Sequence, residues 1–365
     1  MTAAPRPPAV ELAVTALAVI SPVGLDAAAA CAALHAGVSR LQELESCFCL
    51  PPEGPAGDEG GDPEPVIAGR VPTLPAEVEG PERLELLAAA ALQRAVSAAA
   101  LARADLARTA LLLALPAPEP AMAGWGPGRA LLPRLCRRAG VPDWGVQHVV
   151  EAGPAGALRA VEAARALLAA GRVDRCLVLA ADSYLDAGRL AALDLAWRIR
   201  SRRNPDGFLP GEAGAALVLE PAQAAARRRQ RPLGLVGGPS FGRERDPVTG
   251  ERWSSGRGLA DAIRPLLQGP DGPVGRWMLC NMNGEAYPAR EWTLAQVRLS
   301  PDLPVVETLT HPADCIGEVG TAMPLLLAAC ACHAFARGHA PAPAALLWVG
   351  SDDGERAAAV LRPGA

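Results

Sequence analysis

The 365-residue sequence contains no lysine, so arginine supplies all 35 of its positively charged side chains. A Schiff-base lysine and a lysine general base are therefore excluded. Aromatic residues make up only 4% of the chain, and a formal net charge of −4 gives no reason to expect a nucleic-acid partner. The apolar runs at 87–102 and 323–336 are interrupted or too short to cross a bilayer, so no membrane span is predicted.

The cysteines are nine in number, an odd count without regular spacing, and no secretion signal is recognisable before them. This usage predicts reduced thiols in a cytoplasmic protein. Two C-x-C pairs occur, Cys47 with Cys49 and Cys330 with Cys332, and neither has a second pair at the spacing of a metal site. They are predicted to be small core residues, and no metal or other cofactor is expected.

Half of the residues are apolar, which favours a compact α/β protein with a large core. Buried strands alternate with Ala-rich helices, and this order predicts β-α-β units with parallel pairing. Strands are predicted at 10–21, 110–115, 146–150, 175–182, 215–219, 233–236, 276–281, 304–307 and, as the last long strand, 344–350. Helices are predicted up to about 36 and at 84–102, 129–138, 154–170, 258–267, 291–297 and 320–337, and the Pro- and Gly-rich stretch 51–65 is predicted to be an exposed loop.

The stretch 204–220 combines a turn, a Gly-rich corner and a buried strand, in the order N-P-D-G-F-L-P-G-E-A-G-A-A-L-V-L-E. It resembles the D-G-F-x-x-G-E-G-A-x-x-x-V-L-E signature of β-ketoacyl synthases, the condensing enzymes of the thiolase superfamily. The opening A-V-I-S-P-V-G-L-D is similar to the start of the same enzymes. The resemblance implies a thiolase-like five-layered α-β-α-β-α fold built from two pseudo-duplicated halves. These halves would cover 1–220 and 232–365, with a linker at 221–231.

The catalytic residues of that family are not present at the matching positions. Its nucleophilic cysteine lies at the N-terminus of a helix whose counterpart here begins at Pro154, and no Cys, Ser or Thr occurs between 149 and 171. Asn283 takes the place of the first family histidine, and Glu318 takes that of the second. Decarboxylative condensation needs an attacking thiolate and donors to a developing enolate, so ordinary ketoacyl synthase activity is not expected.

Two polar loops are expected to face one pocket if the fold is correct, and no catalytic residue is secure in either. Candidate pocket residues are Phe208, Glu285, Tyr287 and Asp314, and candidate catalytic residues are Cys315, His311, Glu318 and Asn283. A thiol–imidazole pair is one interpretation of this cluster. Another is structural, with the polar side chains capping loops and bonding backbone N–H groups. Metal binding and non-catalytic ligand binding are the remaining alternatives.

Three functions follow from the resemblance. The first is a catalytically silent synthase-like protein of bacterial type that acts as a chain-length-factor-like or scaffold partner. It would form a homodimer or a heterodimer with a condensing-enzyme relative and could meet an acyl carrier protein. The alternative is a divergent acyltransferase or hydrolase that uses Cys315 with His311. A purely structural component of a larger assembly is the third.

Overall fold

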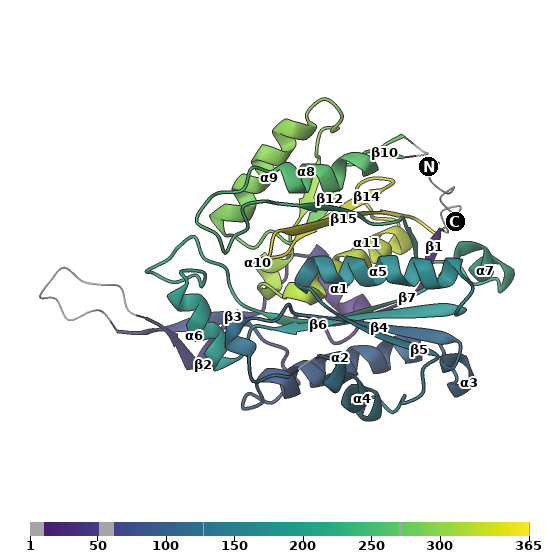
Figure 1. Cartoon of the computed structure of the whole chain (residues 1–365), viewed down its shortest axis with the longest axis horizontal. Coiled ribbons are helices and arrows are strands. Elements are labelled where there is room, and N and C mark those ends of the chain that lie inside the picture. The colour runs from purple at the N-terminus through teal and green to yellow at the C-terminus, as the bar shows by residue number, and fades with distance from the viewer. Residues whose placement is uncertain (1–10, 51–61, 127, 270–271, 365) are drawn as a thin grey trace, which may run out of the picture.

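The computed structural model describes residues 11–50, 62–126, 128–269 and 272–364. Its elements stack in five layers, which Figure 1 shows from top to bottom: outer helices, a sheet, central helices, a second sheet and outer helices. The predicted α-β-α-β-α architecture is confirmed.

The first half forms one sheet in the order β1-β7-β6-β4-β5. In this sheet β7 is antiparallel to both of its neighbours, while β4 is parallel to β5 and β6. Its strands are β1 (Leu12–Ile20), β4 (Thr109–Leu115), β5 (Val146–Glu151), β6 (Arg175–Ser183) and β7 (Glu212–Pro221). The apolar runs of β4, β6 and β7 have almost every residue buried, as expected for strands covered on both faces.

The second half repeats this arrangement in the order β8-β15-β14-β12-β13. Here β15 is the antiparallel strand, and β12 is parallel to β13 and β14. Its strands are β8 (Gly234–Val236), β12 (Trp277–Cys280), β13 (Thr308–Thr310), β14 (Ala345–Gly350) and β15 (Glu355–Arg362), with β9 (Ser240–Arg243) beside β15. Because order and direction match strand for strand, the structure contains the predicted pseudo-duplication.

The first strand joins the two sheets. β1 pairs with β7 along its length, and its residues Leu12–Val14 also pair with β8. Since β8 in turn pairs with β15, the hydrogen-bonded path runs through both halves. Between β7 and β8 lies the short helix α7 (Ala222–Arg227).

Helices α5 (Gly153–Ala169) and α11 (Met323–Arg337) occupy the central layer between the sheets, together with α1 (Ala27–His35). Both α5 and α11 are rich in alanine and have most of their residues buried, which suits helices packed between two sheets. Helices α2 (Gly80–Ala98) and α4 (Gly128–Arg138) cover the outer face of the first sheet, and α8 (Arg257–Ile263) and α9 (Ala286–Leu299) cover that of the second. Three hydrophobic clusters fill the spaces between these layers.

The remaining elements were not predicted or differ from prediction. The segment 304–307 is not a strand, and the strand at this place is β13, which begins one residue later. Helix α9 begins five residues before its predicted start at Glu291. A further strand, β15, follows the one that was predicted to be last. Most of the predicted loop 51–65 lies outside the described residues. The other elements are β2 (Leu41–Cys49), β3 (Glu64–Gly69), α3 (Arg103–Leu106), η1 (Pro120–Met122), α6 (Ala187–Leu195), η2 (Arg264–Leu266), β10 (Gln268–Gly269), β11 (Gly272–Pro273), α10 (Ala313–Ile316) and η3 (Gly320–Ala322).

All nine cysteines are free thiols. Cys49, Cys330 and Cys332 are buried as core residues, while Cys47 is half-buried. Among the described residues, no helix is long and apolar enough to cross a membrane.

Candidate functional site

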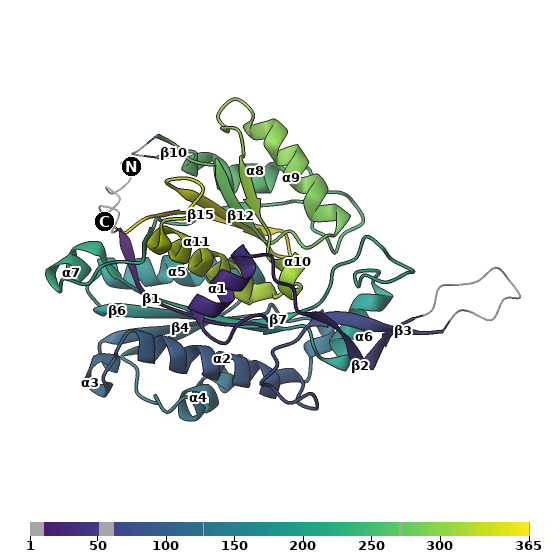
Figure 2. The ribbon, with the colours of Figure 1, turned by 180° about the vertical axis from the view of Figure 1, so that it is seen from behind.

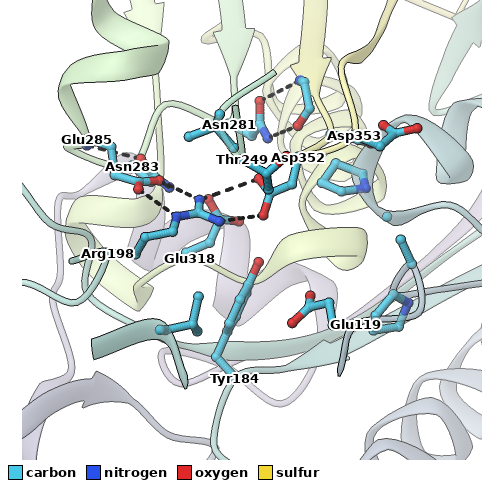
Figure 3. A pocket seen from close by; sticks show the side chains of 18 of the residues that line it. Glu119, Tyr184, Arg198, Thr249, Asn281, Asn283, Glu285, Glu318, Asp352 and Asp353 are labelled. Carbon is cyan, nitrogen blue, oxygen red and sulfur yellow. Dashed lines mark hydrogen bonds and ion pairs between the residues drawn. The ribbon is translucent and has the colours of Figure 1, made fainter. Parts of the chain in front are cut away.

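A cavity of about 470 Å³ opens where the loops after the parallel strands of both sheets meet. The carboxyl ends of parallel strands share one edge of a sheet, which is where α/β folds place their ligand sites. The segments after β4, β6, β12 and β14 supply much of the lining, and the start of α5 closes one side. Figure 3 shows the polar side chains of these segments directed toward one another.

The N-terminus of α5 carries no nucleophile. Pro154 lines the cavity in the first turn of the helix, after Gly153, whose φ of +62° favours glycine. The hydroxyl of Ser351 occupies this helix end: its Oγ accepts the N–H of Ala155 at 2.9 Å and donates to the carbonyl of Ala152 at 3.1 Å. That hydroxyl caps the helix and has no imidazole or carboxylate base among its hydrogen-bond partners in the described structure.

Asn283 faces the cavity from the loop after β12, but its amide is engaged by its own neighbour. Its Nδ2 donates to the carboxylate of Glu285 at 3.0 Å, and its Oδ1 accepts the N–H of the same residue at 3.1 Å. The two bonds form a tight turn at the start of α9. Asn283 therefore positions Glu285, because the oxygen and the NH₂ group of its side-chain amide both bond that residue.

Glu318 lies across the cavity, only 4% exposed, and its carboxylate accepts the N–H of Gly320 at 2.7 Å. Burial is the main cause that raises the pKa of this carboxyl group from 4.5 to about 7, and the negative charges of Asp352, Glu285 and Asp182 add to it. Near neutral pH the carboxyl is thus divided between its neutral and charged forms.

Arginine side chains bind the acidic lining of the cavity, Arg198 and Arg189 among them. Arg198 donates to both oxygens of Glu285 at 2.8 Å and to Asp352 at 2.5 Å, so it links the loop after β12 to the turn between β14 and β15 (Figure 3). Arg189, 1% exposed, donates to Asp182 at 2.8 Å, with its guanidinium 3.8 Å from the ring centre of Tyr184. These charge-assisted hydrogen bonds occupy the guanidinium groups and link the segments that form the cavity wall.

The predicted site residues divide into two groups. Pro154, Asn283, Glu285, Tyr287 and Glu318 line the cavity. The other candidates are absent from the described lining. Phe208 is 1% exposed and packs edge-on against Tyr184, which separates it from the cavity.

His311, Asp314 and Cys315 lie together in the segment leading into and through α10, outside the described cavity lining. His311 Nδ1 is 3.1 Å from Asp314, whose side chain is 69% exposed. Burial, followed by the charge of Asp314, raises the pKa of the Cys315 thiol, the reverse of what an activated nucleophile requires. The two polar loops therefore do not share one pocket along their full lengths: only the Glu318 end of the second loop reaches it.

Sequence reasoning missed the residues of the arginine contacts, Asp182, Tyr184, Arg189, Arg198 and Asp352. A weak signal existed for Asp182, a carboxylate at the end of an otherwise apolar strand. Arg198 and Asp352 are 154 positions apart, so no local spacing relates them. Within the described lining there is no cysteine, histidine or lysine. The cavity wall is made of carboxylate, amide and guanidinium groups that are largely bonded to one another, and it offers no thiolate or imidazole for covalent chemistry.

No family model matches the sequence, and no curated protein matches it either. Solved structures do match its fold, which is that of ketosynthases and ketosynthase/chain length factors. One is the AntDE:AntF complex, described as a type II PKS acyl-carrier protein with its ketosynthase, at a TM-score of 0.76 and 15% identity over 97% of this chain and 99% of that chain. The ishigamide ketosynthase/chain length factor matches at 0.76 and 19% over the same shares. The PfaC keto synthase–chain length factor matches at 0.74 and 13%, over 97% of this chain and 48% of that one.

The chain therefore has the β-ketoacyl-synthase-like thiolase fold, as predicted from 204–220 and the other motifs. At identities of 19% and below, these likenesses establish the fold and not the activity.

Proposed function

We propose that this protein is a catalytically silent β-ketoacyl-synthase-like protein. It acts in the cytoplasm by association, as a chain-length-factor-like or scaffold partner in an acyl, polyketide-type or other bacterial assembly. The observation that carries the proposal is the cavity at the start of α5, which has Pro154 where the family resemblance expects a cysteine. Asn283 and Glu318, which the resemblance assigns to the two histidine positions, line the same cavity, so the three replacements that the proposal rests on lie in one place.

An exposed sheet edge supports a role in association. Strand β5 pairs only with β4 among the described strands, which leaves its other edge without a partner strand. Side chains of Gln147, His148 and Glu151 on this strand are exposed. An unpaired edge presents N–H and C=O groups to which a second chain can add. Pairing there would give the homodimer, or the heterodimer with a condensing-enzyme relative, expected from the resemblance. An acyl carrier protein is a further candidate partner, because the ketosynthase of the AntDE:AntF complex binds one.

The acyltransferase or hydrolase alternative is not favoured. It needs Cys315 activated by His311 in the cavity, whereas neither residue belongs to the described lining. The nearest ion-pair partner of His311 is Asp314, and the same carboxylate raises the pKa of the thiol.

The decisive experiment combines mass spectrometry with a gain-of-thiol variant. Wild-type protein is incubated with acyl-carrier-protein thioesters and, separately, with a thiol-directed inhibitor of condensing enzymes, and its intact mass is measured. We expect no acyl adduct. Pro154→Cys serves as the positive control: a thiol at the N-terminus of α5 should react with the inhibitor if the reagent reaches the cavity.

An acyl adduct on the wild-type protein, mapped to Cys315 or to a cavity residue, would contradict the silent assignment. The association half of the proposal is tested separately by light scattering on the purified chain, alone and mixed with a condensing-enzyme relative. We expect a dimer in at least one of the two samples. A strict monomer with no affinity for a synthase or an acyl chain would refute the partner role.

A further inference from the structure

Three of the five histidines of the sequence gather at one end of the α1–α11 pair, away from the cavity. Figure 2 shows α1 beside α11 in the central layer. His35 is the last residue of α1, His333 lies in the last turns of α11, and His339 follows the end of α11. Gly338, with a φ of +72°, turns the chain there and brings His339 back toward the helix.

The three imidazoles are close enough to share one ion. One ring nitrogen from each can be chosen so that all three atoms lie within 4.8 Å of one another. The ring centres of His35 and His339 are 4.8 Å apart in an edge-on arrangement, and that of His333 is 6.1 Å and 5.8 Å from theirs. In a tetrahedral zinc site, ligand nitrogens at about 2.0–2.1 Å from the metal are separated by roughly 3.4 Å. Small rotations of the exposed His35 and His339 side chains would bring the nitrogens from within 4.8 Å to this separation.

Two details of hydrogen bonding fit metal ligands. His35 Nδ1 is 2.7 Å from the carbonyl oxygen of Cys31, and because a carbonyl only accepts, Nδ1 must carry the proton. This bond fixes the ring and leaves Nε2 of the neutral imidazole with a free lone pair, as in metal sites where the second nitrogen bonds a backbone carbonyl. His333 Nδ1 is buried without a hydrogen-bond partner in the described structure. A buried polar atom of this kind calls for a water or an ion.

The electrostatic surroundings include groups of both signs. Two helices, α1 and α11, end at this cluster, and the negative ends of their dipoles favour a cation. Arg337, in the last turn of α11, opposes it.

We propose that His35, His333 and His339 form a binding site for a zinc-type divalent transition-metal ion. Three imidazole nitrogens without a thiolate or carboxylate suit zinc, copper, nickel or cobalt ions more than magnesium or calcium, which prefer oxygen. Because His35 and His339 are exposed, a water molecule can complete the coordination. The ion would tie α1 to α11, whose other end follows η3 (Gly320–Ala322), two residues after the cavity-lining Glu318. This site is independent of the proposed partner function.

The test is a titration of the tag-free protein with Co²⁺, followed by competition with Zn²⁺. Four-coordinate cobalt absorbs visible light much more strongly than six-coordinate cobalt, so the spectrum reports the geometry. We expect one tetrahedral ion per chain. His339→Ala and His35→Ala should each weaken binding by more than about tenfold, since loss of even an outer-shell partner costs 10–100-fold.

The other two histidines of the sequence supply matched controls. His148→Ala and His311→Ala remove an imidazole elsewhere and should leave the affinity unchanged. A second readout is the rise in Tm on adding Zn²⁺, expected in full in the wild type and both controls and smaller in the ligand variants. The Tm of each variant before zinc is added also shows whether that variant is folded without metal.

Three results would overturn the proposal. One is wild-type protein that gives no tetrahedral cobalt spectrum. Another is a thiolate-to-cobalt charge-transfer band, which would place the ion on the cysteines. The third is equal loss of affinity in the control variants and the ligand variants.

Discussion

Replacing Glu318 by glutamine should stabilise the protein at pH 8 and leave its stability unchanged near pH 4. Burial, reinforced by neighbouring carboxylates, raises the pKa of this side chain in the folded state from 4.5 to about 7. Between these values the folded state holds a proton that the unfolded state releases. The stability of the wild type therefore falls as the pH rises from about 4.5 to about 7, and is constant beyond that as far as this group is concerned.

The magnitude follows from the two pKa values. Their difference corresponds to about 3 kcal/mol of free energy of unfolding, with one pKa unit equal to 1.36 kcal/mol. A glutamine at position 318 keeps the shape and the oxygen that accepts the N–H of Gly320, but it never carries the buried charge. The variant should thus equal the wild type when Glu318 is protonated and exceed it by about 3 kcal/mol when Glu318 is ionised.

The assay is urea unfolding of both proteins at several pH values between 4 and 8. Glu45→Gln is a matched control, because Glu45 is exposed on β2 and should give a difference close to zero at every pH. A difference between wild type and Glu318→Gln that does not change with pH would refute the buried charge at Glu318. So would a glutamine variant that is the less stable protein at pH 8.

Two further predictions concern stability. Glu212→Ala should lower the free energy of unfolding by about 3–5 kcal/mol, because it leaves the guanidinium of Arg83, bonded to Glu212 at 2.5 Å and 2.7 Å, buried without its carboxylate. Gly320→Ala should lower the free energy of unfolding by more than about 3 kcal/mol, because its φ of +48° is left-handed and a Cβ would lie 2.0 Å from an Asp182 oxygen. Gly171 also has a left-handed φ, +62°, but open space surrounds it, so Gly171→Ala should lower the same quantity by only about 1–2 kcal/mol. Denaturant unfolding measures both.

Each of these predictions has a contrasting case. For the ion pair it is Glu307→Ala, which breaks the exposed bond to Arg276 and should lower the stability far less than Glu212→Ala. Equal losses at Glu212 and Glu307 would contradict the role assigned to burial. For the glycines, equal losses at positions 320 and 171 would show that the close approach to Asp182 does not matter.

Much of the fold could be predicted because its signals are local. Apolar runs such as 110–115 and 175–182 identify strands buried on both faces, and the Gly and Pro residues around 204–214 identify a turn whose order resembles one family. Strand β15 was not predicted, although the Asp353-Gly354 turn that joins it to β14 is a sequence signal for a hairpin. The strand predicted at 304–307 lies instead at 308–310, because these are the residues that pair with β12.

The candidate site divides along the same line. Motif spacing predicts that Pro154, Asn283 and Glu318 occupy the catalytic positions of the resembling family, and the structure places all three on one cavity. The sequence could not predict which polar residues of the loop around Cys315 and Glu318 face that cavity. Cys315 and Glu318 are three positions apart, yet α10 and the turn at Gly317 send only Glu318 to the cavity wall.

By itself the sequence determined the kind of fold and the absence of a thiol at the start of α5, because hydrophobic period, turn residues and residue identity are properties of short segments. Only the tertiary structure decided which charges meet. Arg198 contacts Glu285 and Asp352, and His35 lies beside His333 and His339. The partners are so far apart in the sequence that no local pattern relates them. These contacts are set by the packing of one half of the duplicated fold against the other and of α1 against α11.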